Sequence, residues 1–143
     1  MATALPTRHA LVTGAAGGIG RGICMALIAQ ARRDGVGIHI SAASTQAGER
    51  LDALLDDLRA QGAQASGVVG DLTVPEQCAD IVAQAERAAG DLHMLVCNAG
   101  ASGPGRLVDL PVAQWDRTFA LNTRAVWLLA QAAHAGLVRT RRS

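Results

Sequence analysis

The chain has 143 residues, which suits one domain with a real core and is too short for two. Half of its residues are hydrophobic, and its formal net charge of +1 shows neither the basic excess typical of nucleic-acid binding nor an acidic tail. No apolar run has the length of a signal peptide or a membrane span. We therefore expect a cytoplasmic protein whose partners include neither nucleic acid nor a membrane.

Two residue types that often carry chemistry are missing from the sequence. All 13 residues counted as lysine or arginine are arginines, and there is no tyrosine. The three cysteines, Cys24, Cys78 and Cys97, are widely spaced within apolar runs. This pattern is typical of buried thiols in a reducing compartment, so no disulfide and no metal site is predicted.

Strands and helices are predicted to alternate along the chain. Apolar runs predict strands at about 9–12, 36–41, 64–69 and 92–97, the last of them buried on both faces. Helical spacing of apolar residues predicts helices at about 18–33, 51–61, 73–90 and 111–135. A polar turn is expected at 43–46, after the second strand. Thr73 and Glu76 have the spacing of a capping box, which predicts the start of the third helix.

Four strand–helix units joined by short loops predict an α/β fold with a parallel, doubly wound sheet of the Rossmann-like kind. We expect the strand order 3-2-1-4, which places the first loop where the winding reverses. The first and fourth helices are expected on one face of the sheet and the second and third on the other. The whole chain, 1–143, is predicted to be one partial nucleotide-binding domain.

The long helix predicted at 111–135 is apolar on nearly every face between 125 and 133. Such a helix must be covered on more than one side, so we expect a homo-oligomer formed through it. The residues after it, 136–143, are basic and lack the apolar strand expected next. Three origins of this atypical tail stay open: a frameshift, a premature stop or an artificial boundary.

A glycine-rich turn follows the first predicted strand, in the stretch LVTGAAGGIGRG at 11–22. The order strand, glycine turn, helix points free helical N–H groups at an anion. Gly14 can adopt backbone angles closed to other residues, while Gly18 and Gly20 allow a phosphate and a packed strand to come close. The turn is predicted to bind the pyrophosphate of a dinucleotide; the alternative is a tight turn of purely structural importance.

Three other strand ends meet this turn at the carboxyl edge of the predicted sheet, where ligands of such sheets bind. They are 41–45, Asp71 and 98–100. Asp71 is predicted either to bind an adenine amino group or to cap the following helix. Asn98 is predicted either to order the loop between neighbouring strands or to form only an Asx turn, and Gly100 leaves room for a ribose.

These motifs resemble the N-terminal part of the short-chain dehydrogenase/reductase family, over about 9–135. Residues 13–20 match its TGxxxGxG motif, and Asp71 stands where the family has its adenine-contacting aspartate. Residues 97–100 match its NNAG motif, with Cys97 in place of the first asparagine. Asn122, in FALNT, matches the helix asparagine that holds a water linked to the active-site lysine. The stretch 40–51 is most similar to 3-oxoacyl-carrier-protein reductases.

The resemblance implies a set of cofactor-binding residues spread over these strand ends. They are Gly14, Ala16, Gly17, Gly18, Ile19, Gly20, Ser41, Asp71, Leu72, Asn98, Ala99 and Gly100. From the catalytic set it implies Asn122 alone, because the family's serine and Tyr-x-x-x-Lys lie beyond this chain. His39, His93 and His134 lie in or at the end of regular elements, so we expect structural or surface roles for them.

The cofactor is expected to be NADP or NAD, with NADP favoured. An acid at the end of the second strand would bind the ribose diol of NAD, and 41–45 contain hydroxyl groups but no acid. Arg21 and Arg50 are the nearest basic residues, and ordinary helix-surface roles suit both better.

Two classes of function stay open. The first is an NAD(P)-dependent oxidoreductase that moves hydride between the nicotinamide and a small ketone or alcohol, here an incomplete chain, truncated before the catalytic half and inactive by itself. The second is a non-catalytic or vestigial dinucleotide-binding fragment. A structural partner that dimerises through the long helix has no motif of its own.

Overall fold

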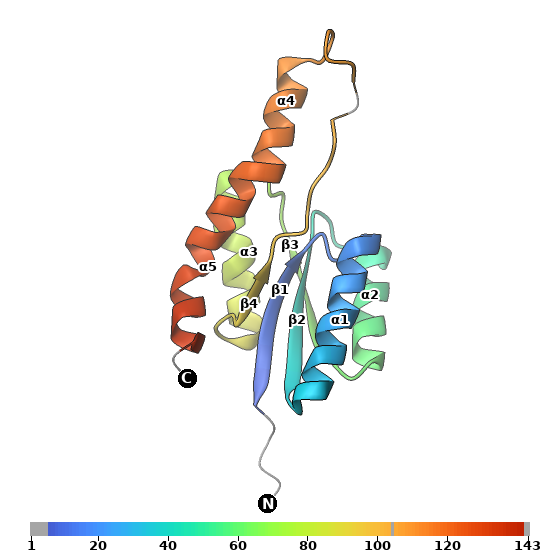
Figure 1. The fold of residues 1–143 in the computed structure, drawn as a ribbon, viewed down its shortest axis with the longest axis vertical. Coiled ribbons are helices and arrows are strands. Elements are labelled where there is room, and N and C mark those ends of the chain that lie inside the picture. The colour runs from blue at the N-terminus through green and yellow to red at the C-terminus, as the bar shows by residue number, and fades with distance from the viewer. Residues whose placement is uncertain (1–5, 104, 142–143) are drawn as a thin grey trace, which may run out of the picture.

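A computed structural model describes residues 6–103 and 105–141 of the chain (Figure 1). Strands and helices alternate up to the fourth strand, after which a long loop leads into a helical arm. The elements are β1 (Thr7–Thr13), α1 (Gly18–Asp34), β2 (Gly37–Ser44), α2 (Glu49–Ala60), β3 (Gln64–Val69), α3 (Pro75–Ala89), β4 (Met94–Val96), α4 (Val112–Phe119), the π-helical turn η1 (Ala120–Arg124) and α5 (Ala125–Arg141).

The four strands form one sheet in the order β3-β2-β1-β4, and every neighbouring pair is parallel. The register places Leu11 of β1 beside Ser41 of β2 and Leu95 of β4. The predicted doubly wound sheet and its strand order are therefore confirmed. Because β1 is central, the loop that follows it lies where the winding reverses.

The helices cover the two faces in pairs, and the expected pairing is wrong. One buried cluster contains side chains of α1 and α2, including Ile28 and Leu54. A second cluster contains side chains of α3 and α5, including Ile81 and Leu129. Figure 1 shows α1 and α2 together on one side of the sheet, with α3 and α5 on the other.

The handedness of the crossovers explains this arrangement. The connections β1–α1–β2 and β2–α2–β3 advance across the sheet in the same direction, so two right-handed crossovers place both helices on one face. The connection from β3 to β4 returns past β2 and β1, which moves α3 to the opposite face. Reversal of winding, rather than alternation of helices, decides which helices are neighbours.

Two strand boundaries differ from those expected. β2 continues to Ser44, three residues past the predicted end, because β3 pairs with it as far as Val69. The expected polar turn at 43–46 is therefore partly strand. β4 is shorter than expected, and its three residues are half-buried rather than buried. Among the described residues only β1 pairs with β4, so one edge of β4 lacks a neighbouring strand.

The predicted long helix is interrupted by η1 and extends beyond its expected end to Arg141. α5 packs against α3 through Ala125, Leu129 and Ala133, all buried. The opposite side of the helix is open, with Trp127 62% exposed. At its C-terminal end, Arg139 forms an ion pair with Asp91. The predicted atypical tail is thus helical through Arg141, and its last two residues lie outside the described part.

A polar seam runs through the sheet beneath the end of α3. His9 Nδ1 lies 2.8 Å from the carbonyl of Gly90, an atom that can only accept, so Nδ1 carries the proton. In the neutral ring, Nε2 then accepts from Ser41 Oγ at 2.9 Å. Ser41 Oγ lies 3.1 Å from Ser66 Oγ, which lies 2.9 Å from His39 Nε2. Desolvation by burial lowers the pKa of both histidines.

In the described part of the chain, every helix is too short or too polar to cross a membrane.

Candidate functional site

The glycine turn after β1 leaves the N-terminus of α1 without a side-chain cap. Gly14 adopts a φ of 62°, and its carbonyl accepts a hydrogen bond from Gly17 N at 3.1 Å. Gly17 is the N-cap residue and supplies no side chain to the first turn. The leading N–H groups of α1 are therefore free to bind an anion.

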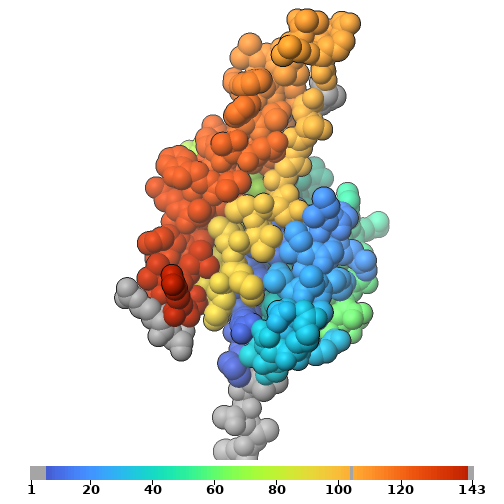
Figure 2. Space-filling view, viewed as in Figure 1, coloured from blue at the N-terminus to red at the C-terminus, as the bar shows by residue number. Residues whose placement is uncertain are grey.

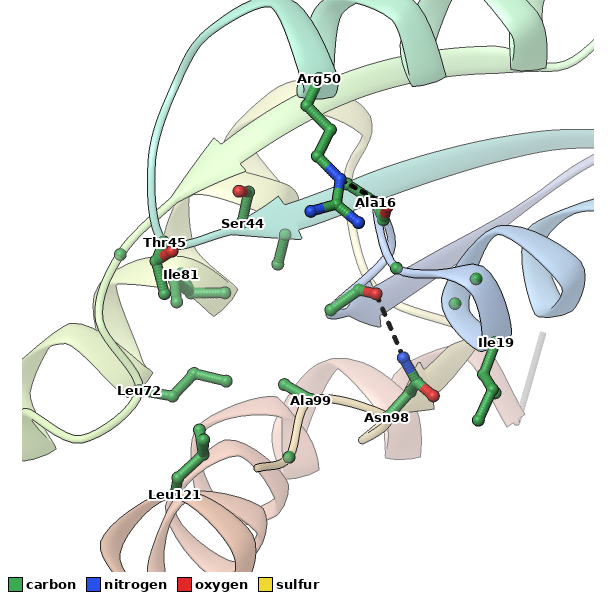
Figure 3. A pocket seen from close by; sticks show the side chains of 17 residues that line it. Ala16, Ile19, Ser44, Thr45, Arg50, Leu72, Ile81, Asn98, Ala99 and Leu121 are labelled. Atoms are coloured by element: carbon green, nitrogen blue, oxygen red, sulfur yellow. Dashed lines mark hydrogen bonds between the residues drawn. The ribbon is translucent and has the colours of Figure 1, made fainter. Parts of the chain in front are cut away.

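A cavity of about 460 Å³ lies in front of this turn, at the carboxyl ends of the strands (Figure 3). All the residues predicted to bind a cofactor line it except Ser41 and Asp71. Those on its wall are Gly14, Ala16, Gly17, Gly18, Ile19, Gly20, Leu72, Asn98, Ala99 and Gly100.

Ser41 does not face the cavity, and this position contradicts the prediction that it binds the cofactor. Its side chain is fully buried inside the sheet and belongs to the polar seam with His9 and Ser66. Because β2 runs three residues further than expected, Ser44 and Thr45 occupy the place on the cavity wall that had been expected for Ser41.

Asp71 does not line the cavity either, although its neighbours in the sequence, Gly70 and Leu72, do. Its Oδ1 accepts hydrogen bonds from Thr73 N at 2.8 Å and Thr73 Oγ1 at 2.7 Å. These bonds, first that of the hydroxyl and then that of the backbone, lower the pKa of Asp71. The predicted capping box is wrong, because Val74 is the N-cap of α3 and no side chain caps it. Asp71 instead orders the turn that precedes the helix.

Asn98 and Thr13 fasten the loop after β4 to the end of β1. Asn98 Nδ2 donates to the carbonyls of Thr13 at 3.0 Å and Gly14 at 3.2 Å. In return, the buried hydroxyl of Thr13 accepts from the backbone N–H groups of Asn98 and Ala99, both at 3.0 Å. Asn98 therefore orders the loop between neighbouring strands, the first of its two predicted roles. The matching role of Thr13 was missed, because its partners are about 85 residues away in the sequence.

Asn122 lies in η1 and contacts the same loop after β4 at Ala101, which follows the residues held by Thr13. Its Oδ1 accepts from Ala101 N at 3.0 Å, and its Nδ2 donates to Ala101 O at 2.8 Å. A Cβ on Gly100 would lie 3.2 Å from Asn122 Oδ1, so the glycine permits this close approach. Both polar ends of the Asn122 side chain are thus used to hold the loop.

A second cavity, of about 680 Å³, adjoins the first and shares Ala99 and Gly100 with it. Asn122 lines this second cavity, together with the stacked rings of Trp115 and Phe119, whose centroids are 4.5 Å apart. Cys97 lies on the same wall, and burial raises the pKa of its thiol. The loop at Ala99 and Gly100 thus borders both cavities, with the glycine turn lining the first and the aromatic side chains lining the second.

Arg50 was not expected in the site, and the structure places it on the wall of the first cavity. Its Nε donates to the carbonyl of Ala16 at 3.1 Å, which holds the guanidinium over the cleft (Figure 3). Ser44 and Thr45 line the same cavity. Arg21 points elsewhere and forms an ion pair with Asp57. The first turn of a helix gives no local signal for a ligand contact, so only the packing of α2 beside α1 reveals this position.

No group of three histidine, cysteine or acidic side chains that could hold a metal occurs among the residues 6–103 and 105–141. His39 is bonded within the sheet, and His93 Nδ1 accepts from the backbone N–H of His9. His39 is thus buried within the sheet, whereas His93, just before β4, and His134, on α5, are exposed, and none of the three lines the first or the second cavity.

The model of the short chain dehydrogenase family matches residues 8–143. Short-chain dehydrogenase/reductase eriH of Hericium erinaceus is 36% identical over 128 residues, which cover 89% of this chain and 48% of that protein. The 2,3-dihydro-2,3-dihydroxybenzoate dehydrogenase of Bacillus subtilis is 32% identical over 118 residues, covering 82% and 42%. The chain spans about half the length of these curated relatives.

Solved structures agree with this assignment. A metagenomic short-chain oxidoreductase in complex with NADP superposes with a TM-score of 0.82 at 28% identity, over 96% of this chain and 59% of that one. The 3-oxoacyl-[acyl-carrier protein] reductase of Brucella melitensis in complex with NAD gives 0.79 at 27% identity, over 96% and 51%. The chain belongs to the short-chain dehydrogenase family.

Proposed function

We propose that this chain is the dinucleotide-binding part of an NAD(P)-dependent oxidoreductase that moves hydride between the nicotinamide and a small ketone or alcohol. The observation that carries this proposal is the uncapped N-terminus of α1 in front of an open cavity. A Cβ on Gly18 would have no neighbour within 4 Å, so the space beside the free N–H groups is clear. An uncapped helix end with clear space before it suits a pyrophosphate.

The residues along the cleft fit the rest of such a cofactor. The turn from Gly14 to Gly20 would hold the pyrophosphate, and Leu72 would flank the adenosine half. Ala99 and Gly100, shared by both cavities, would receive the nicotinamide ribose. A bound nicotinamide supplies the hydride, and the chain's own residues bind and orient it. The contact of Asp71 with the adenine remains a prediction, since its Oδ1 is used by Thr73.

Arg50 supports a preference for NADP over NAD. Its guanidinium, held by the carbonyl of Ala16, lines the same cavity as Ser44 and Thr45, so an extra phosphate on the adenosine ribose would meet a positive charge there. Arginine binds phosphate with two parallel N–H groups, which makes it well suited to this task.

The chain by itself is proposed to bind without turning over substrate. It contains no tyrosine and no lysine, so the proton donor of the family's reaction and the group that adjusts its pKa are both missing. Asn122 is the one position of the catalytic set that it carries. The alternative, a non-catalytic dinucleotide-binding fragment, shares the binding step, so binding is the property to test first.

Calorimetry with NADPH and the variant Gly18→Val tests the site. The branched side chain would fill the clear space in front of α1, so we expect binding to be lost. The matched control is Gly22→Val, at another helical glycine with no neighbour within 4 Å that does not line the cavity. Equal affinities for wild type and Gly18→Val would refute the site.

Three further expectations remain proposals. A homo-oligomer through 111–135 is supported by the exposure of Trp115, Phe119 and Trp127 along the helical arm. Likeness to 3-oxoacyl-carrier-protein reductases is supported by the Brucella melitensis structure, beside relatives with different names. The cytoplasmic location rests on the three free cysteines.

A further inference from the structure

The π-helical turn η1 makes side-chain hydrogen bonds to two different loops of the cleft. Asn122 holds both backbone groups of Ala101, in the loop after β4. Two residues later, the guanidinium of Arg124 donates to the carbonyl of Thr73 at 2.5 Å, in the turn after β3. Single π-turns within helices often occur at functional sites. Here the turn connects the helical arm to both loops that border the first cavity.

The turn that Arg124 contacts is rigid within itself. Asp71 Oδ1 accepts from the backbone and the hydroxyl of Thr73, and the carbonyl of Asp71 accepts from Val74 N at 3.0 Å. Asp71 N donates to Gln77 Oε1 at 2.6 Å, which ties the turn to α3. The carbonyl of Thr73 is not used by these bonds, and Arg124 is its hydrogen-bond partner.

Two apolar side chains of the cavity wall lie on either side of this link. Leu72 belongs to the turn after β3, and Leu121 belongs to η1. Figure 3 shows them as neighbours on the side of the cavity across from Arg50. Leu72 is buried and Leu121 is half-buried, so both fill space between sheet and arm. The position of the turn relative to the arm therefore determines how these two side chains form this wall of the cavity.

We propose that Arg124 is a positioning residue for the cofactor cleft. By holding the Thr73 carbonyl against η1, it fixes the wall of Leu72 and Leu121 against which the adenosine half of a dinucleotide would pack. The consequence for binding rests on the proposed function. The consequence for the geometry of the turn does not, since it concerns the chain alone.

The test compares Arg124→Gln and Arg124→Lys with a matched control, Arg59→Gln. Arg59 also donates its guanidinium to a backbone carbonyl, that of Ala65 at 3.0 Å, but it lines neither cavity of the cleft. The first measurement is calorimetry with 2′,5′-ADP, the adenosine half of NADP. We expect Arg124→Gln to weaken binding about tenfold, because the wall of Leu72 and Leu121 would have to be ordered on binding without this charge-assisted hydrogen bond. Arg124→Lys should keep most of the wild-type affinity, because an ammonium group also donates to a carbonyl.

The second measurement is amide hydrogen exchange without ligand. In Arg124→Gln, exchange should accelerate at Thr73 and Val74 and stay unchanged at Ala101, which Asn122 holds independently. If wild type binds neither 2′,5′-ADP nor NADH, the proposed function fails while exchange still decides the geometric role. Unchanged exchange at Thr73, equal acceleration at Ala101, or the same loss of affinity in Arg59→Gln would overturn the role of Arg124.

Discussion

Gly18 and Gly20 stand two residues apart and meet different demands. A Cβ on Gly20 would lie 2.1 Å from the carbonyl oxygen of Gly14, so this glycine lets α1 pack against the end of β1. A Cβ on Gly18 would meet open space on the cavity side. Substitution at Gly20 should therefore damage the fold, whereas substitution at Gly18 should damage binding.

Arg50 carries a prediction about cofactor choice at the same scale. Arg50→Ala should weaken the binding of NADPH on the order of ten- to a hundredfold, because its phosphate would lose a charge-assisted partner. The same variant should leave the affinity for NADH almost unchanged. Calorimetry with both cofactors measures the ratio of affinities. Arg21→Ala is the control, since Arg21 is paired with Asp57 on the helix surface. An equal loss for the two cofactors would contradict the preference.

At the scale of elements, the sheet combines an apolar half with a polar seam. A chain of hydrogen bonds runs from His39 of β2 through Ser66 of β3 and Ser41 of β2 to His9 of β1. His9 ends the chain by donating to Gly90, the residue that closes α3. In the neutral ring Nε2 accepts from Ser41; protonation would reverse this bond and place a positive charge inside the sheet, which burial disfavours.

The seam predicts how stability depends on pH. Burial holds the pKa of His9 and His39 below the 6.5 of an unfolded histidine, so the unfolded chain binds more protons near that pH. Their contribution to stability is therefore present above pH 6.5 and is lost as the pH falls through the lowered values. Urea unfolding between pH 7 and 5 should give a decreasing free energy of unfolding.

Two variants separate this effect from other titrations. His9→Gln should reduce the pH dependence, while His134→Gln, at an exposed position on α5, should leave it unchanged. The carboxylates with lowered pKa values, Asp34, Asp71 and Asp91, titrate below this window. A pH slope in His9→Gln equal to that of wild type would rule out the seam as its source.

At the scale of the whole molecule, the surface exposes apolar side chains in one region and an unpaired strand edge in another. The helical arm projects beyond the sheet (Figure 2), and the side chains of Leu107 and Val108, in the loop before α4, and of Val112, at its start, are exposed. In the described part of the chain, β4 pairs on one side only, so its other edge offers free backbone groups. Both features favour association.

Sedimentation should therefore detect self-association of the purified chain. Replacing Trp115 and Trp127 by Gln should shift the population toward monomer, because both rings are more than half exposed. The double variant Arg32→Gln and Arg33→Gln, on the surface of α1 away from the arm, is the control. A wild-type chain that stays monomeric at high concentration would contradict the proposed oligomer.

The chain alone should not reduce ketones. Loss of one positioned acid–base group typically lowers a rate by a factor of about 10² to 10⁴, and here both the tyrosine and the lysine are missing. The measurement follows nicotinamide absorbance with NADPH, simple ketones and 3-oxo esters. Turnover that copurifies with the chain and disappears in Gly18→Val would disprove this expectation.

The glycine turn, the parallel strand order and most of the cavity wall followed from the sequence alone. Each depends on a local pattern, such as an apolar run ending at Thr13 or a glycine spacing from 14 to 20, and local patterns act through backbone angles and burial of neighbouring residues. The carboxyl edge of a parallel sheet then brings Asn98 and Gly100 to the turn whatever the details of packing.

Only the tertiary structure decided where Ser41, Arg50 and Arg124 lie. Strand β2 runs on past Ser41 because β3 pairs with it, an interaction between distant segments that no local pattern contains. The contacts of Arg50 with Ala16 and of Arg124 with Thr73 join residues 34 and 51 positions apart. Long arginine side chains reach whatever carbonyl the packing of helices brings near, so their partners depend on the assembled fold rather than on spacing in the sequence.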